Sequence, residues 1–306
     1  MSVMEGAIIY SNLLVLLSIG LTMTYITTAV PNFAQGSFAV FGSYVALTLF
    51  RLYGIHPYAS IPITFVAGGL LGLVIYIGVL KPLIRRGAEV VILMIATLAV
   101  DLILLGVIGA YSDYLGVITK KSAKKFIFTP YDFSIGSMSG IFFVSIAVIA
   151  LILFGLYLLL FKTKFGVAMR ASMENPSLAE IMGVNVETTR LTSWILSAAL
   201  ASLAGALLPF RQEIVPMTGG IIIVSIFASS IVGGLGSIFG ALIGGYVVGM
   251  SESFVTFELS KVFGTGVLVY SRVVSLIVLI IMLILAPKGI MSIKWRRLKW
   301  LRSFLS

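Results

Sequence analysis

The chain has 306 residues, of which 59% are hydrophobic and only 10% are charged. Soluble proteins carry about 25% charged residues, so the composition excludes an ordinary soluble domain. It predicts an all-α, polytopic membrane protein with a single transmembrane domain over residues 1–306. Lys and Arg number 21 against 11 Asp and Glu, an excess that is typical of cytoplasmic loops in membrane proteins. Nucleic-acid binding is not expected, because no basic patch lies on a soluble domain.

The residue types needed for most enzymatic chemistry are missing. The sequence has no cysteine and one histidine, His56, which excludes disulfides, thiolate metal sites and histidine-cluster metal sites. It also lacks the G-x-x-x-x-G-K-[ST] loop that holds ATP phosphates, the H-E-x-x-H zinc motif and the G-x-S-x-G nucleophile motif. We therefore expect neither an enzyme nor a bound metal or cofactor.

Apolar segments of the right length recur along the chain, and a membrane-spanning helix needs roughly 20 apolar residues. Eight or nine helices are predicted, depending on two short or interrupted segments, and the candidates are 7–30, 33–50, 61–80, 90–110, 141–161, 191–208, 221–232, 239–254 and 269–286. Residues 111–140 are expected to form a long polar connection. With nine crossings, the Lys/Arg bias places the N-terminus outside and the basic tail (287–306) inside. The four lysines within 120–125 then lie outside, against that rule.

Small residues repeat every four positions in the later segments, as in Ser193, Ser197, Ala201 and Gly205, and in Gly236, Gly240 and Gly244. Such rows let helix backbones approach closely in a membrane, where hydrophobic burial does not drive association. Packing within the subunit is the favoured interpretation. A moving contact or a subunit interface is the alternative.

A polar segment over residues 162–190 interrupts the apolar sequence and carries its own helix signals. Asn175 can cap a helix and Pro176 suits the first helical position, while Gly183 can end the helix in a left-handed conformation. Leu178, Ile181 and Met182 fall on one face of that helix. This amphipathic helix either lies on the protein's own surface or in the lipid headgroups, or it docks into a soluble partner, which is the sharper hypothesis.

Two further features suggest a route through the membrane. Helix-breaking residues interrupt the apolar sequence at Asn32–Ser37 and Ile231–Ser237, at corresponding places in the two halves, and such breaks in transporters point to a substrate route near the bilayer midplane. Asp101 lies near the middle of a predicted span. A charge there is costly and often functional, although a hydrogen-bonded structural role is favoured. Glu252 is expected to be solvated near the end of its helix.

Three motifs together resemble the permeases of branched-chain amino-acid ABC importers. Residues 32–44 read NFAQGSFAVFGSY, similar to N-F-A-H-G-x-F-x-x-x-G-A-Y in that family, with Gln35 in place of the more usual His. Residues 170–185 resemble the family's cytoplasmic loop R-A-x-x-x-N-x-x-x-A-x-x-x-G-I-N. Residues 233–241 match G-G-x-G-S-x-x-G-A. The sequence is closer to the LivH-type than to the LivM-type subunit, although Asp101 is not expected in either.

The resemblance implies a type II ABC importer-like permease with about eight or nine transmembrane or re-entrant helices. It also implies cytoplasmic ABC ATPase subunits, a second permease subunit (LivM-type or a second copy) and an extracytoplasmic substrate-binding protein, in the cell membrane of a prokaryote. The loop helix of such importers inserts into a groove on the ATPase. The candidate ATPase-coupling residues are Arg170, Glu174, Asn175, Leu178, Ala179, Glu180, Ile181, Met182 and Gly183.

A translocation path through the chain is the second predicted site. Its candidate residues are Asn32, Gln35, Gly36, Asp101, Gly233, Gly234 and Gly236. The expected cargo is a branched-chain or related amino acid, moved by ATP hydrolysis on another subunit. The alternatives are a permease for another small solute, such as urea, a simple amide or a sugar, and a secondary transporter that works without ATP. A membrane scaffold that transports nothing is a third possibility.

Overall fold

The computed structural model describes residues 2–174 and 176–292, and most of them are helical. Seven helical stretches are long and apolar enough to cross a membrane. They are α1 (Val3–Thr28), α2 (Gln35–Tyr53), the Pro57–Arg85 stretch, α5 (Val90–Thr119), α6 (Gly140–Lys162), the Val186–Phe210 stretch and α11 (Ile238–Phe263). Two shorter apolar helices are α10 (Thr218–Gly233) and α12 (Ser271–Leu285). The predicted all-α polytopic fold and its eight or nine apolar helices are confirmed.

Two of these stretches contain several shorter elements, and further short elements form the connections between helices. The Pro57–Arg85 stretch consists of η1 (Pro57–Ser60), α3 (Ile61–Ile75), the π-helical turn η2 (Tyr76–Leu80) and α4 (Lys81–Arg85). The Val186–Phe210 stretch joins α9 (Val186–Leu207) to η4 (Leu208–Phe210). The polar segment forms α7 (Lys164–Glu174) and α8 (Pro176–Ile181). The remaining turns and strands are η3 (Thr129–Tyr131), β1 (Ser134–Ile135), β2 (Met138–Ser139), η5 (Thr265–Tyr270) and η6 (Ile290–Ser292).

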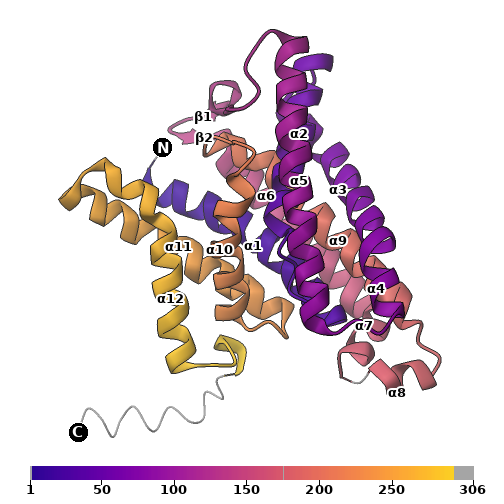
Figure 1. The fold of residues 1–306 in the computed structure, drawn as a ribbon. Coiled ribbons are helices and arrows are strands. Elements are labelled where there is room, and N and C mark those ends of the chain that lie inside the picture. Colours follow the sequence, from indigo (N-terminus) through magenta and orange to yellow (C-terminus); the bar gives the residue numbers. More distant parts are fainter. Residues whose placement is uncertain (1, 175, 293–306) are drawn as a thin grey trace, which may run out of the picture.

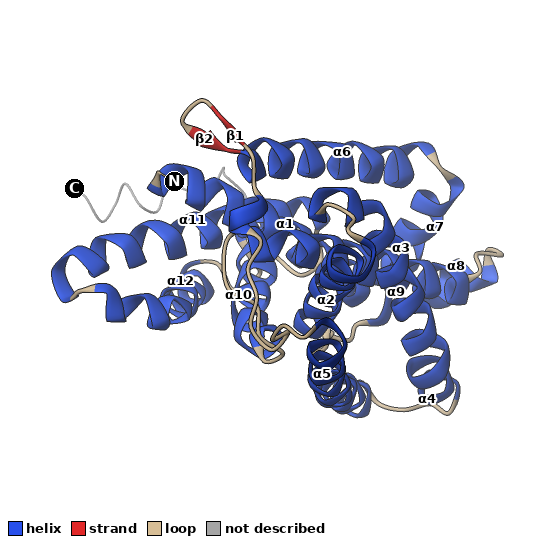
Figure 2. Ribbon diagram, turned by 90° about the horizontal axis from the view of Figure 1, so that it is seen from above, coloured by secondary structure: helices blue, strands red, loops and turns tan. Residues whose placement is uncertain are grey.

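Helix α1 is the centre of the bundle, and it contacts α6, α9, α10 and α11 (Figure 2). Helices α5, α6 and α12 lie at the periphery in this view, and many of their Val, Ile, Leu and Phe side chains are exposed. In a bilayer those side chains would face lipid or another membrane protein, because the hydrocarbon is as apolar as they are.

The connections alternate between the two ends of the bundle. The N-terminus and the β1–β2 hairpin lie at one end, whereas α4, α7 and α8 lie at the other (Figure 1). The predicted connection 111–140 is shorter than expected, because α5 continues to Thr119 before Lys120 ends it with a φ of 51°. The lysines that follow lie at the N-terminal end, where Lys124 pairs with Asp113 at 3.0 Å and Lys125 with Glu213 at 2.8 Å. These acidic partners offset part of the positive charge that the Lys/Arg rule does not expect there.

Small residues pack the helices within the subunit, as favoured from the sequence. A Cβ added to Gly205 of α9 would lie 1.8 Å from the carbonyl oxygen of Ala39 on α2, and one added to Gly244 would lie 2.0 Å from the carbonyl oxygen of Ser229. Only glycine permits these approaches, because any side chain would overlap the facing backbone. Gly236 is different, since nothing lies within 4 Å of its added Cβ.

Candidate functional site

The predicted coupling segment consists of an inner helix, α7, and an outer helix, α8. Helix α7 contacts α1, α6 and α9, and its Met169 and Ser172 are buried. Gly166 lies so close to α6 that an added Cβ would be 2.0 Å from the carbonyl oxygen of Leu160. Arg170 is exposed and its guanidinium carbon lies 5.1 Å from the centre of the Phe161 ring. Helix α7 is thus packed against the membrane helices, while the Arg170 guanidinium remains at its surface.

Helix α8 presents apolar side chains outward. Leu178, Ile181 and Met182 are 56%, 81% and 77% exposed, whereas Ala179 is buried. The helix ends as predicted, since Gly183 has a φ of 85° and its N–H donates to the carbonyl of Glu180, while the N–H of Val184 donates to that of Ala179. The predicted cap Asn175 and the side chain of Glu174 lie outside the described part of the chain. The exposed apolar face is the property that the docking hypothesis requires.

Charged contacts connect this segment to neighbouring helices. Glu187, in the first turn of α9, pairs with Lys81 of α4 at 2.5 Å and with Arg85 at 3.5 Å. Arg190 donates from Nε to the backbone carbonyl of Thr27 at the end of α1, at 3.3 Å. The coupling segment, the basic turn after α3 and the end of α1 therefore meet at one end of the bundle.

The first predicted break lies deep in the bundle and forms a closed amide network. Asn32 Nδ2 and Ser197 Oγ both donate to Gln35 Oε1, at 3.1 and 3.0 Å. The Gln35 amide nitrogen donates in turn to the carbonyl oxygen of Leu17, at 3.3 Å. All three amide and hydroxyl side chains are fully buried. Because Leu17 and Ser197 lie near the middle of α1 and α9, the network lies near mid-depth and satisfies the polar groups of the interrupted chain.

The second predicted break is not at the same depth, contrary to expectation. Helix α10 ends at Gly233, and Gly234, with a φ of 107°, packs against Gly289 beyond the end of α12. Gly233 meets Gly240 of α11 so closely that an added Cβ would lie 1.9 Å from its carbonyl oxygen. This break is a tight turn between α10 and α11, and it was misplaced because a glycine run marks a helix end without indicating depth. The structure does not bring Gly233, Gly234 and Gly236 together with Asn32, Gln35 and Gly36.

Asp101 joins the first break to α5. Its Oδ1 accepts a hydrogen bond from Ser37 Oγ at 2.6 Å, and the side chain is half-buried. One turn earlier on α5, Thr97 Oγ1 accepts from the backbone N–H of Phe33 at 3.3 Å. Gly36, next to Ser37, abuts Gly219 of α10, since an added Cβ would lie 2.1 Å from its carbonyl oxygen. The path residues of the first half therefore cluster where α2, α5 and α10 meet.

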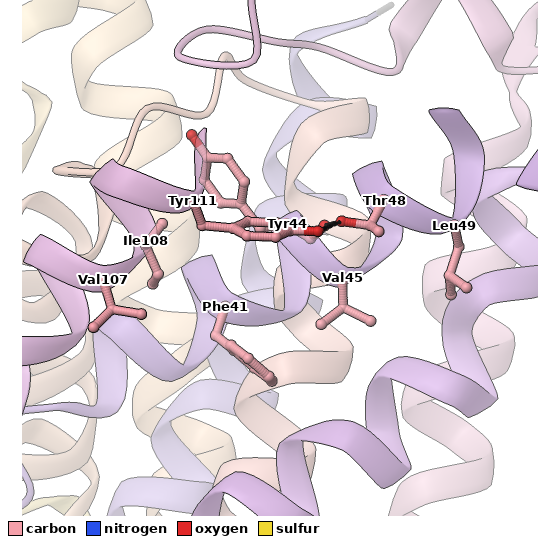
Figure 3. A pocket seen from close by; sticks show the side chains of 8 residues that line it. All are labelled: Phe41, Tyr44, Val45, Thr48, Leu49, Val107, Ile108 and Tyr111. Atoms are coloured by element: carbon pink, nitrogen blue, oxygen red, sulfur yellow. Dashed lines mark hydrogen bonds between the residues drawn. The ribbon is translucent and has the colours of Figure 1, made fainter. Parts of the chain in front are cut away.

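A cavity of about 320 Å³ lies between α2 and α5 (Figure 3). Its wall is formed by the apolar side chains of Phe41, Val45, Leu49, Val107 and Ile108. The rings of two tyrosines and the side chain of one threonine, Tyr44, Tyr111 and Thr48, complete it. The hydroxyls of these last three residues are satisfied within the protein. Tyr44 donates to the carbonyl of Ala123 at 3.0 Å, and Thr48 Oγ1 and Tyr111 OH lie 2.7 Å apart. The cavity therefore offers an apolar interior.

The structure corrects the expectation for Glu252, which is buried rather than solvated. Its side chain is ion-paired with Arg272 of α12 and accepts hydrogen bonds from Tyr10 of α1, Ser225 of α10 and Ser275 of α12. The last three distances are 3.1, 2.8 and 2.5 Å. Four helices thus share one carboxylate.

Arg272 is the principal residue that sequence reasoning missed. It lies inside the predicted span 269–286, and an arginine in such a segment implies an acidic partner in the same bundle. A second arginine, Arg211, lies over the Tyr10 ring with its guanidinium carbon 4.4 Å from the ring centre, and donates to the carbonyl of Gly6 at 3.2 Å. In the described part of the chain, no three His, Asp or Glu side chains gather as a metal site.

Known proteins resemble the chain over almost its full length. The family model described as "Branched-chain amino acid transport system / permease component" matches residues 3–283. A protein named probable branched-chain amino acid transport permease protein LivH, from Methanocaldococcus jannaschii, is 64% identical over 98% of this chain and 95% of its own length. The permease BraD of Pseudomonas aeruginosa, from a high-affinity branched-chain amino acid transport system, is 28% identical over 90% and 91%.

A solved structure shares the fold. PsaBC from Streptococcus pneumoniae, in complex with Fab, aligns with a TM-score of 0.50 and 15% sequence identity, covering 98% of this chain and 95% of that one. At that identity the likeness concerns the fold alone, and it agrees with the helical, multi-pass architecture. The match to the family model over residues 3–283 decides the family. This multi-pass membrane protein therefore belongs to the permease components of branched-chain amino acid transport systems.

Proposed function

We propose that the chain is the permease subunit of an ABC importer that moves branched-chain or related amino acids, with ATP hydrolysed on a separate cytoplasmic subunit. The observation that carries this proposal is helix α8, which exposes Leu178, Ile181 and Met182 beyond the apolar helices. A partner that covers this face would remove three large apolar side chains from water. Each is worth about 1.5–3 kcal/mol when fully buried.

The sequence and the relatives support the same assignment. No P-loop motif occurs in the chain, so energy from ATP must come from another subunit. The relatives named for branched-chain amino acid transport match 90% or more of this chain. We infer that the chain itself catalyses no reaction and that substrate is delivered by an extracytoplasmic binding protein.

A second permease subunit, LivM-type or a second copy, completes the proposed assembly. Peripheral helices α5 and α12 both expose large apolar side chains, among them Leu102, Ile103, Ile280 and Ile284, which are 57–76% exposed. Such faces suit contact with another membrane protein as well as lipid. We propose that part of this surface is covered by the partner permease.

Transport by the reconstituted complex tests the proposal. The permease is co-purified with the proposed ATPase and placed in proteoliposomes with the proposed binding protein and radiolabelled leucine. We expect uptake that requires ATP and the binding protein. Uptake without ATP would instead show a secondary transporter. ATP-dependent uptake of urea, an amide or a sugar, but not of leucine, would overturn the substrate class.

The role of α8 has its own test. Ile181→Asp places a charge on the exposed apolar face and should remove the ATPase from the purified permease and abolish uptake, while the amount of permease in the membrane stays unchanged. Val262→Asp is the matched control, because Val262 is 75% exposed at the opposite end of the bundle, near the end of α11. Retention of the ATPase and of uptake in Ile181→Asp would show that α8 does not dock.

A further inference from the structure

The interface between α2 and α5 contains a carboxylate, that of Asp101, and an apolar cavity further along the same two helices. Asp101 meets Ser37 at the start of α2, and the cavity begins one turn later on α2, at Phe41. We propose that this interface is a transient binding site, here called the station, for the transported amino acid. In it Asp101 faces the ammonium group and the cavity takes the aliphatic side chain. This inference rests on the proposed function, because it assumes an amino acid as cargo.

The cavity has a suitable size and chemistry for an aliphatic side chain. Small-molecule pockets measure roughly 300–1,000 Å³, so a cavity of about 320 Å³ suits a small ligand. Its lining is almost entirely apolar, which favours apolar groups over polar ones. The hydroxyls in its wall, those of Tyr44, Thr48 and Tyr111, are already satisfied by the protein. A side chain that carried its own polar group would find no partner there and would lose its hydration.

Asp101 is placed to meet an ammonium group. Among the described residues it makes no ion pair, since the six ion pairs of the structure involve other acidic side chains. Its one side-chain partner is the Ser37 hydroxyl, and the carboxylate is half-buried rather than enclosed. An unpaired charge within a membrane helix is costly unless it has a function or a partner. A passing ammonium group supplies that partner.

The two parts follow one another along both helices. The cavity begins four residues after Ser37 on α2, about 6 Å along the axis, and six residues after Asp101 on α5, about 9 Å. An amino acid whose ammonium group lies at Asp101 therefore points its aliphatic side chain toward the near end of the cavity. An acyl chain of a lipid could also enter an apolar cavity, but it would make no use of the Asp101 carboxylate.

Photo-crosslinking during transport tests the cavity. Photo-leucine, which carries a diazirine in its side chain, is supplied to the reconstituted complex and irradiated, and the labelled peptides are identified by mass spectrometry. We expect adducts on α2 and α5 at Val45 and Ile108. Val45→Phe, which fills the cavity, should reduce them at least fivefold. Val74→Phe, on an exposed position of α3, should leave them unchanged.

The outcomes separate the inference from the proposed function. If photo-leucine is imported but its adducts lie outside α2 and α5, or if Val45→Phe does not reduce them, the station is wrong while the function stands. The same holds if a lipid occupies the cavity and excludes the probe. If the wild-type complex imports no leucine, the proposed function itself fails.

A pair of substitutions tests Asp101. Asp101→Asn removes the charge but keeps an oxygen that can accept from Ser37, whereas Ser37→Ala removes the hydrogen bond but keeps the charge. We expect leucine uptake to fall at least tenfold in Asp101→Asn and less than twofold in Ser37→Ala, at equal amounts of folded permease. Equal uptake by Asp101→Asn and wild type, or an equal loss in both variants, would assign Asp101 a structural role and overturn its part in the station.

Discussion

Replacing Glu252 with Leu removes the carboxylate that α10, α11 and α12 share with α1 and leaves the Arg272 guanidinium without its counter-charge. The Arg272 side chain is only 18% exposed and that of Glu252 only 4%. Breaking a buried ion pair by removing one partner costs about 3–5 kcal/mol, because the remaining charge is uncompensated. We therefore expect Glu252→Leu to lower the free energy of unfolding by that amount.

The double variant Glu252→Leu/Arg272→Leu separates the charge from the packing. With both charges removed, no ion remains buried, and such replacements are often neutral or stabilising. Tyr10, Ser225 and Ser275 still lose an acceptor, which costs about 1–3 kcal/mol for each buried group left unsatisfied. We expect the double variant to recover part, but not all, of the loss.

Denaturant titration of the purified permease in mixed micelles measures these differences. Glu258→Leu is the matched control on the same helix, because Glu258 is 68% exposed and pairs only with Lys261 three residues away. It should change the free energy of unfolding by less than about 1 kcal/mol. A loss below about 1 kcal/mol in Glu252→Leu, or a double variant no more stable than the single one, would refute the argument from an uncompensated charge.

Three further substitutions, one of them a control, test the packing and the surface charges. Gly205→Ala forces a methyl group against the carbonyl of Ala39, at a built distance of 1.8 Å, and should cost about 1–3 kcal/mol through overpacking. Gly106→Ala faces open space and should be neutral or stabilising, so an equal loss in both would contradict the close approach. Glu187→Gln breaks a partly exposed pair with Lys81. It should cost less than about 1 kcal/mol and less still at high salt, and a loss above about 2 kcal/mol in the same titration would show a larger role.

The spans could be predicted from the sequence because hydropathy and helix length are local properties. The end of α8 at Gly183 was equally predictable, since a glycine in a left-handed conformation follows an amphipathic turn. The extension of α5 to Thr119 was missed. The sequence prediction ends this span at residue 110, where the polar connection begins, whereas a helix can continue beyond the apolar region wherever its polar side chains find partners, as Asp113 does in Lys124.

The arrangement of the site was much less predictable. The sequence predicts Asn32 and Gln35 as polar residues in a break, but Ser197, which donates to Gln35, lies 162 positions away in the sequence. The Glu252–Arg272 pair was missed because the prediction for Glu252 rests on its place near a helix end and none was made for Arg272. That criterion ignores the neighbouring helices, which here cover both side chains. Contacts between helices depend on how the bundle packs, and hydropathy along one helix does not contain that information.

The side-chain composition of α1 nevertheless indicates its central position in the bundle. Hydrophobicity alone does not distinguish a core helix from one that faces lipid, because both are apolar all round. Helix α1 carries more buried hydroxyl and amide side chains than α5 or α6, among them Ser11, Asn12, Ser18, Thr22 and Thr24, against Thr97 and Ser112 on α5 and Ser145 on α6. Lipid offers such groups no hydrogen-bond partner. Within the bundle Asn12 donates to Ser145 and accepts from Tyr246, and Ser18 and Thr24 donate to carbonyls of α1 itself. In this bundle, hydroxyl and amide side chains therefore mark the helix that other helices surround, and the spans poor in them form its periphery.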